Sequence, residues 1–191
     1  MDDLNGQLVN LRPIKDADLE YLAALKNDMR TQGWNQRLPP SYTPRTVRER
    51  IERNTGPNKG MWAIETKDGK VVGHISYDEE RVRLRASIGI ITGMEAWGKG
   101  YAREAMELIL RFLFEERGMQ VALLYTLSDR VRMMGLAKKL GFRTSSVLRE
   151  ATVIGGKASD AIIMDLLREE YYSTRGSADK SSPTSRVAGP M

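Results

Sequence analysis

Residues 97–102, Trp-Gly-Lys-Gly-Tyr-Ala, form a glycine-rich loop between an apolar stretch at 87–92 and an amphipathic stretch that begins at Arg103. Glycine and alanine carry little or no side chain, so the backbone of this loop can approach a bound group closely. The first turn of a helix also presents unpaired N–H groups and the positive end of the helix dipole. Together these features favour the binding of a phosphate or pyrophosphate by main-chain amides.

Two phosphate-binding motifs fit this loop, and the loop alone leaves both open, together with a simple turn. Residues 93–100 read G-x-x-x-x-G-K-G, which matches a nucleotide-binding P-loop except at Gly100, where a Ser or Thr hydroxyl would hold magnesium. Residues 97–102 also resemble the Q/R-x-x-G-x-G/A loop that binds coenzyme A in the GNAT superfamily of acetyltransferases. In that alignment Gly100 and Ala102 fill the fourth and sixth places, and Trp97 replaces Gln or Arg.

The composition limits the class of protein. The chain has 191 residues, 41% hydrophobic and 29% charged, as in one ordinary globular domain. It has no cysteine, which excludes disulfides, thiolate metal sites and acyl-cysteine intermediates, and its single histidine, His74, excludes a histidine-rich metal site. No apolar run approaches the roughly 20 residues that span a bilayer, and the first residues lack the pattern of a signal peptide. We therefore expect a cytoplasmic protein with no membrane partner.

The charge suits an anionic ligand. The formal net charge is +5, and no nucleic-acid-binding motif accompanies it. We expect no nucleic-acid partner.

The hydrophobic pattern predicts an α/β domain at residues 1–172 and a polar, flexible tail at 173–191. The predicted order, β-α-α-β-β-β-α-β-α-β-β, indicates one mixed central sheet of about seven strands. Strands are expected at 7–12, 61–66, 70–77, 84–92, 121–126, 142–149 and 157–167, and helices at 17–29, after Thr43-Pro44, at 102–117 and from Ser128 or Asp129 to Leu140.

This order of elements separates the two motifs. The strand–helix–strand unit at 87–126 is expected to give two neighbouring parallel strands, whereas the strands before it form an antiparallel meander. A P-loop belongs to a sheet of repeated β-α-β units, and no apolar strand here ends in a carboxylate that would hold magnesium. A P-loop nucleotide binder is therefore only a distant third hypothesis for function.

The same order, together with residues 97–102, resembles the GNAT superfamily over residues 7–171. Residues 97–105, 139–142 and 166–171 are similar to its RimJ/RimL-like branch of ribosomal-protein N-terminal acetyltransferases. The resemblance implies the GNAT fold, no metal, and transfer of an acetyl group from acetyl-CoA to a primary amine, either a protein N-terminus or a small molecule. Because no cysteine can carry the acetyl group, the amine would attack directly in a ternary complex. The chain would act as a monomer or homodimer.

The resemblance also assigns a coenzyme site. The two strands that flank the helix at 102–117 are expected to separate near their carboxyl ends and admit the pantetheine arm. Its amides can pair with the backbone of Ile90 and Thr92, and an N–H near Ile90 or Ile91 would stabilise the oxyanion. The implied coenzyme-binding residues are Ile90, Ile91, Thr92, Trp97, Gly98, Lys99, Gly100, Tyr101, Ala102, Arg103 and Arg130.

Three family positions differ in this chain. Arg130, Met133 and Ala137 stand where relatives commonly have Asn, Ser and a proton-donating Tyr. Arg130 contacts a coenzyme phosphate, stabilises a thiolate by its charge, or is only a solvated residue at a helix start, and Met133 is expected to pack. These replacements motivate an alternative function, an acyl-CoA-binding regulatory module without turnover.

The catalytic residues are the least determined part. Tyr125, near the end of a central strand, is the predicted proton donor, and His74 is either a structural residue or a base. Trp34 either shapes the acceptor pocket or packs. Other conceivable acid–base residues are Tyr77, Glu65, Glu95 and Glu150, and a Glu of the resembled branch is replaced here by Ser87.

Overall fold

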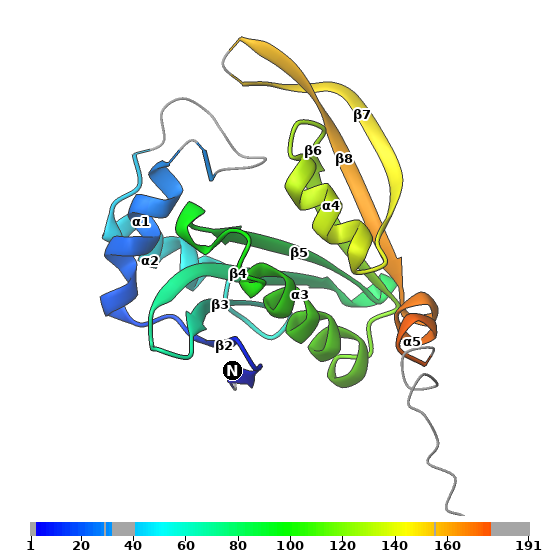
Figure 1. Cartoon of the computed structure of the whole chain (residues 1–191), viewed down its shortest axis with the longest axis horizontal. Coiled ribbons are helices and arrows are strands. Elements are labelled where there is room, and N and C mark those ends of the chain that lie inside the picture. Colours follow the sequence, from blue (N-terminus) through cyan, green and yellow to red (C-terminus); the bar gives the residue numbers. More distant parts are fainter. Residues whose placement is uncertain (1–2, 29, 32–40, 155, 177–191) are drawn as a thin grey trace, which may run out of the picture.

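The structure, a computed structural model, describes residues 3–28, 30–31, 41–154 and 156–176. One eight-stranded sheet runs through these residues in the order β1-β2-β3-β4-β5-β6-β8-β7 (Figure 1). Its strands are β1 (Leu4–Asn5), β2 (Val9–Pro13), β3 (Lys59–Thr66), β4 (Val71–Glu80), β5 (Arg85–Thr92), β6 (Val121–Leu127), β7 (Arg143–Ile154) and β8 (Lys157–Leu167). The helices are α1 (Leu19–Asn27), α2 (Pro44–Arg53), α3 (Tyr101–Arg111), α4 (Val131–Lys139) and α5 (Arg168–Gly176).

The pairing of the strands confirms the predicted mixed sheet. Strands β5 and β6 are parallel and joined through α3, and all other neighbours are antiparallel. Strands β3, β4 and β5 form the expected antiparallel meander, so the glycine-rich loop follows a meander and not a repeated β-α-β unit. The hairpin between β3 and β4 turns at Gly69, whose φ of +81° lies in the region that favours glycine.

Two elements were not predicted. The sheet has eight strands because Leu4–Asn5 pairs with β2, and a two-residue strand is too short to show an alternating pattern. Helix α5 follows β8 directly and continues past residue 172, across the predicted start of the tail. Residues 177–191 of that tail, and Trp34, lie outside the described residues.

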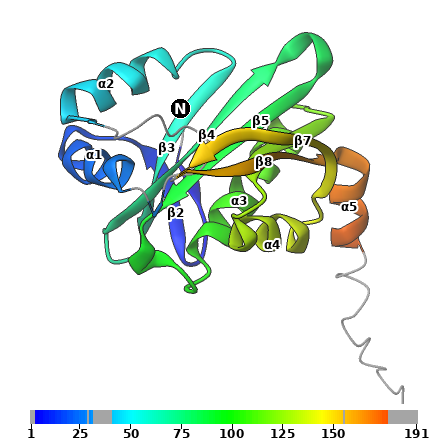
Figure 2. The same ribbon diagram turned by 90° about the horizontal axis from the view of Figure 1, so that it is seen from above.

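The helices cover both faces of the sheet. Figure 2 shows α1 and α2 on one face and α3 and α4 on the other. On the α3 face, Trp62 stacks on Tyr77 with ring centroids 5.4 Å apart and meets Phe112 edge-on at 5.3 Å. On the other face, a smaller apolar cluster joins α1 and α2 through Leu22 and Val47. Each helix pair buries an apolar face against the sheet, as its 3.6-residue pattern predicts.

A single carboxylate fixes the start of α3 against the amino-terminal strands. Glu104 lies in the first turn of α3 and accepts hydrogen bonds of 2.7 Å from the backbone N–H groups of Gln7, Leu8 and Val9. A negative charge is also favourable at the amino terminus of a helix. Glu104 therefore holds the glycine-rich loop and the helix that follows it in a fixed position.

A buried ion pair fixes α1. Arg12 of β2 lies 2.7 Å from the Asp18 carboxylate, and both residues are less than a tenth exposed. Burial tends to raise the pKa of Asp18, but the bonds donated by Arg12 and by the Lys15 N–H outweigh it and lower that pKa. Arg12 also contacts Glu65 at 2.7 Å. This network connects the start of α1 to the sheet.

Candidate active site

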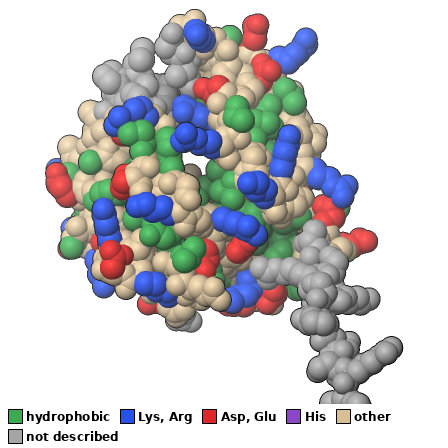
Figure 3. Space-filling view, in the orientation of Figure 1, with side chains coloured by type: hydrophobic (Ala, Val, Ile, Leu, Met, Phe, Trp, Pro, Cys, Tyr) green, Lys and Arg blue, Asp and Glu red, His purple; other side chains and the backbone are tan. Residues whose placement is uncertain are grey.

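The two parallel strands separate where the sequence predicts it. Strands β5 and β6 pair only from Arg85 with Val121 to Ile88 with Leu124, and beyond that point each continues without the other. A cleft of about 1440 Å³ lies at this opening and extends over both faces of the sheet. Figure 3 shows the opening in the middle of the molecule, surrounded by Lys and Arg side chains.

Beyond its pairing with β6, β5 directs the backbone N–H and C=O groups of every second residue toward the cleft. The N–H of Gly93 donates to the carbonyl of Val72 at 2.9 Å, which makes these residues a hydrogen-bonded antiparallel pair. Because such pairs alternate along the strands, the N–H and C=O of Ile91 also point to β4, and those of Ile90 and Thr92 point toward the cleft. Of the two residues predicted to supply an oxyanion donor, the geometry therefore favours Ile90 over Ile91.

The glycine-rich loop borders the same cleft. Gly98 and Gly100 have φ values of +77° and +83°, in the region that favours glycine, and Gly100 directly precedes α3. A Cβ on Gly98 would meet no atom within 4 Å, so the space above this residue is open. The first N–H groups of α3 thus face an open cleft at the positive end of the helix dipole.

The structure brings most of the predicted site residues together. Tyr125 and every predicted coenzyme-binding residue except Lys99 and Tyr101 line the cleft. The Lys99 side chain is exposed, and Tyr101 packs against the main core. These two residues can contribute backbone groups to the loop, but their side chains do not line the cleft.

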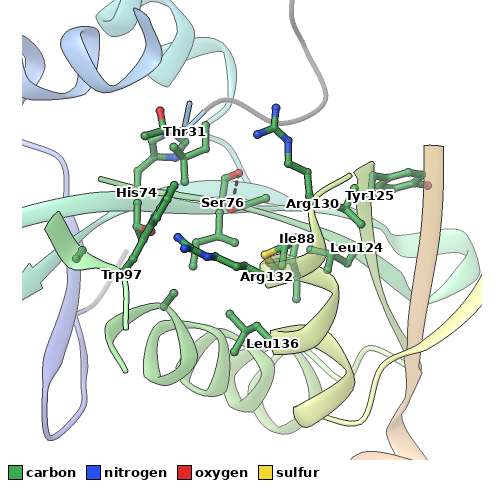
Figure 4. A pocket seen from close by; sticks show the side chains of 18 of the residues that line it. Thr31, His74, Ser76, Ile88, Trp97, Leu124, Tyr125, Arg130, Arg132 and Leu136 are labelled. Atoms are coloured by element: carbon green, nitrogen blue, oxygen red, sulfur yellow. Dashed lines mark hydrogen bonds between the residues drawn. The ribbon is translucent and has the colours of Figure 1, made fainter. Parts of the chain in front are cut away.

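Arg132, which sequence reasoning missed, lies over the Trp97 ring. Its guanidinium carbon is 4.7 Å from the ring centroid, within cation–π distance. Figure 4 shows Arg132 reaching from α4 toward Trp97 across the cleft, whereas Arg130 points in another direction. Arg132 thus supplies a cation beside the loop whose first residue is Trp97. An Arg in the first turn of a helix carries no sequence signal that distinguishes this role.

The start of α4 differs from the prediction. The residue preceding the helix is Arg130, and no side chain caps it, so the expected cap by Ser128 or Asp129 is wrong. The Arg130 Nε lies 3.5 Å from the carboxylate of Asp129. Met133 packs against the core and Ala137 is fully buried, which confirms the predicted packing role of Met133.

A cationic group occupies the cleft on the α1 side. Lys26 Nζ of α1 lies 3.1 Å from His74 Nε2 of β4, and each residue is only 4% exposed. Burial, reinforced by the charge of Arg50, lowers the pKa of Lys26 to about 8. Burial, with Lys26 and Arg50, also lowers the pKa of His74 well below its usual value. His74 is therefore neutral at pH 7 and accepts a bond from the Lys26 ammonium, which disfavours it as a catalytic base.

We expect stability to fall in mild acid because of His74. Below about pH 6.5 the unfolded chain protonates this residue and the folded chain does not, so the free energy of unfolding decreases as pH falls. Between pH 7.5 and 5.5 the expected loss from this group is about 1 kcal/mol. Urea unfolding at both pH values would measure it, and His74→Gln should remove this part of the difference. An identical pH dependence in wild type and variant would contradict this assignment.

The remaining acid–base candidates are placed unequally. Tyr125 of β6 directly follows the last residue paired with β5, is 43% exposed and lines the cleft. Tyr77 borders the cleft but is buried in the aromatic cluster. The other three carboxylates do not line it: Glu65 bonds Arg12, Glu95 accepts from Tyr21, and Glu150 lies on β7.

Asp78 is a second residue that sequence reasoning missed. Among the described residues that line the cleft, the only carboxylates are Asp78 and Asp129. Asp78 is exposed on β4 directly opposite Ser87, and it shares a face of the strand with Ser76 and His74. The alternation of His74, Ser76 and Asp78 along β4 was a signal that could have identified it.

Comparison with known proteins identifies the family. A family model described as "Acetyltransferase (GNAT) domain" matches residues 9–143, and the chain belongs to this family. It is 25% identical, over 90% of its length and 96% of the relative, to the SPbeta prophage-derived uncharacterized N-acetyltransferase YokL of Bacillus subtilis. It is 24% identical, over 85% of its length and 93% of the relative, to the putative ribosomal N-acetyltransferase YdaF of Bacillus subtilis.

Solved structures show the same fold. The spermidine N-acetyltransferase of Vibrio cholerae in complex with CoA and spermine superposes with a TM-score of 0.79 at 20% identity, over 87% of this chain and 99% of that one. A GNAT-family acetyltransferase of Bacillus anthracis gives a TM-score of 0.74 at 18% identity, over 88% and 99% of the chains. The chain is thus an acetyl-CoA-dependent acetyltransferase of the GNAT family.

Two further observations concern the described residues alone. They contain no cluster of three or more His, Cys, Asp or Glu side chains arranged to hold a metal ion. No helix in this part of the chain combines the length and the apolar character needed to span a bilayer.

Proposed function

We propose that this enzyme transfers the acetyl group of acetyl-CoA to a primary amine by direct attack within the cleft. The separation of β5 from β6 beyond Ile88 is the observation that carries the proposal. This separation leaves the edge of β5 with unused backbone groups beside the glycine-rich start of α3. The loop amides can therefore hold the pyrophosphate of acetyl-CoA while its thioester reaches the opening between β5 and β6. The domain at residues 1–172 supplies all of these parts, and we propose that it acts in the cytoplasm as a monomer or homodimer.

The glycine-rich loop is the proposed pyrophosphate site. Gly98, Gly100 and Ala102 line the cleft, which supports binding by the amides of residues 98–102, and a helix start typically stabilises a negative charge by 0.3–1 kcal/mol, or about 2 kcal/mol when partly buried. Arg103 and Arg132 add positive charge on two sides. The pantetheine arm then pairs with the edge of β5 at Thr92 and Ile90.

The chemistry requires an oxyanion donor, an outlet for the two protons that the nitrogen loses and a source for the one that the thiolate gains. The Ile90 N–H is the proposed donor to the thioester oxygen as negative charge develops there. The amine must lose a proton before it attacks the carbonyl carbon, and Asp78 on β4 is the proposed acceptor, directly or through water. As the carbon–sulfur bond breaks, the departing thiolate takes a proton from Tyr125, and the second proton of the attacking nitrogen passes through water to restore the Tyr125 phenol, so that one net proton leaves from Asp78 to solvent. The products are an amide and free coenzyme A.

The acceptor class follows less directly. The similarity to RimJ/RimL-like enzymes and to the putative ribosomal N-acetyltransferase YdaF supports a protein N-terminus, and a small amine is the alternative. Arg130, Met133 and Ala137, which replace three common family residues, favour a second candidate, a coenzyme-binding regulatory module. Release of free thiol from acetyl-CoA with a panel of peptides and small amines separates the two. Tight coenzyme binding without turnover on any amine would favour the regulatory module.

Replacing the proposed proton donor tests the catalytic assignment. We expect Tyr125→Phe to lower kcat about 100-fold, because general acid catalysis typically contributes at least that factor. The Kd for coenzyme A should not change, since the ring remains. Tyr172→Phe on α5 is a matched control, because that tyrosine is 44% exposed and does not line the cleft. An unchanged kcat in Tyr125→Phe would remove Tyr125 from the mechanism.

A further inference from the structure

The α1–α2 end of the cleft is lined by three cations. Lys26 comes from α1, Arg30 follows that helix, and Arg50 comes from α2. Arg30 is already paired with Asp28 at 2.8 Å. Arg50 forms no ion pair with any carboxylate in the described ranges, and its buried Nε has no hydrogen-bond partner among them. Positive charge thus accumulates at this end of the cleft.

The charged side chains at this end are hydrogen-bond donors. An ammonium and a guanidinium can only donate. Because Lys26 donates to Nε2 of His74, the ring hydrogen of His74 must lie on Nδ1, which has no partner within the described structure. This end of the cleft therefore has two positive charges, on Lys26 and Arg50, and hydrogen-bond donors on Lys26, Arg50 and His74. Carboxylate and phosphate oxygens match such a site, whereas an amine does not.

The burial of Lys26 near a second cation lowers the stability of the folded state. Burial and the nearby charge of Arg50 both oppose the charged form of Lys26, which is only 4% exposed. Arg50 brings a second positive charge near this buried ammonium, and strongly perturbed groups of this kind gather at functional sites. An anion bound between Lys26 and Arg50 would offset this repulsion.

The opposite end of the same surface carries the negative charge. His74, Ser76 and Asp78 lie on one face of β4, and two strand steps of two residues each place Asp78 roughly 13 Å from His74. An ammonium group is favoured near Asp78 and disfavoured near Lys26. A molecule with an amine at one end and an acid at the other matches both.

We propose that the amine acceptor also carries a carboxylate or phosphate group, and that Lys26 and Arg50 hold this acidic group while the amine reaches the thioester. The inference rests on the proposed acetyl transfer and adds the substrate class to it. It also sets this enzyme apart from a polyamine acetyltransferase, because a polycation would meet like charges at this end of the cleft.

Matched acceptors test the inference in the full chain. The probes are 4-aminobutanoate, phosphoethanolamine, butylamine and 1,4-diaminobutane, together with peptides that differ only in Glu, Ala or Lys at the second position. We expect kcat/KM for acidic acceptors to exceed that for cationic ones at least 10-fold. The two acidic amines distinguish a preference for carboxylate from one for phosphate.

Charge changes at Arg50 provide the variants. Arg50→Gln should raise KM for the acidic acceptors about 10-fold and leave butylamine kinetics and the Kd for coenzyme A unchanged. Arg50→Glu should reverse the preference toward cationic acceptors. Arg48→Gln is the control, because Arg48 lies on the exposed side of the same helix, paired with Asp16. Equal or higher kcat/KM for the cationic acceptors in the wild type, or an unchanged ratio in Arg50→Glu, would overturn the inference.

Binding measurements separate this inference from the proposed reaction. Calorimetry with the two acidic amines should show binding to the wild type and at least 10-fold weaker binding to Arg50→Glu, whether or not acetyl transfer occurs. If the acidic amines bind but are not acetylated, the proposed acetyl transfer is wrong and the site for the acidic group stands. Turnover without any preference for acidic acceptors would retain the transfer and defeat the site.

Discussion

Ala102→Asp is expected to weaken the binding of coenzyme A at least 100-fold while the domain stays folded. Ala102 lies in the first turn of α3 and lines the cleft beside the loop glycines. A carboxylate there would stand within a few ångströms of the proposed pyrophosphate site. Two unit charges at about 4 Å repel by about 4 kcal/mol at an effective dielectric constant of 20, and a 100-fold loss needs only about 3 kcal/mol.

The same substitution should not destabilise the helix. Acidic residues in the first turn interact favourably with the helix dipole, typically by 0.3–1 kcal/mol. Ala102→Asn is the matched control, since it has nearly the same shape without the charge. Calorimetry gives the Kd for coenzyme A, and thermal unfolding checks the fold. If the Asp and Asn variants bind coenzyme A equally well, the pyrophosphate does not lie at this helix start.

Asp18→Ala is expected to lower the free energy of unfolding by about 3–5 kcal/mol. The Arg12–Asp18 pair is buried, so removal of the carboxylate leaves the Arg12 guanidinium without its nearest counter-ion in a site with little water. The backbone N–H of Lys15 also loses its acceptor. Glu65 keeps one contact with Arg12, which places the expected loss toward the lower end of that range.

Asp16→Ala is the control for this experiment. Asp16 stands two residues away in the same turn and pairs with Arg48, but both side chains are about half exposed or more. Exposed pairs contribute about 0–1 kcal/mol, so this variant should unfold almost like the wild type. Denaturant unfolding at pH 7 measures both variants. Equal effects of the two substitutions would show that the Arg12–Asp18 pair does not anchor α1.

The glycine-rich loop and the surrounding sheet could be predicted because their signals are local. Two glycines at a strand-to-helix junction indicate backbone conformations with positive φ, and Gly98 and Gly100 adopt such conformations. The meander and the crossover followed from apolar periods of two and 3.6 residues. The separation of β5 from β6 was predicted from the resemblance to a known fold and not from periodicity, and the strand pairing confirms it.

The contacts and placements that were missed join distant segments. Lys26 and His74 are 48 positions apart, and only the packing of α1 on β4 brings their nitrogens to 3.1 Å. Arg132 reaches Trp97 only because α4 packs beside the cleft. Asp78 lines the cleft because β4 pairs with β5 in a register that sets it opposite Ser87. Such placements follow from tertiary packing and not from residue spacing.

A structure of the protein with coenzyme A bound tests the central claim most directly. We expect pyrophosphate oxygens about 3 Å from the backbone nitrogens of Gly98 to Ala102, and the pantetheine amides paired with Ile90 and Thr92. A coenzyme whose pyrophosphate lies elsewhere, or whose thioester end does not reach the opening between β5 and β6, would contradict the account.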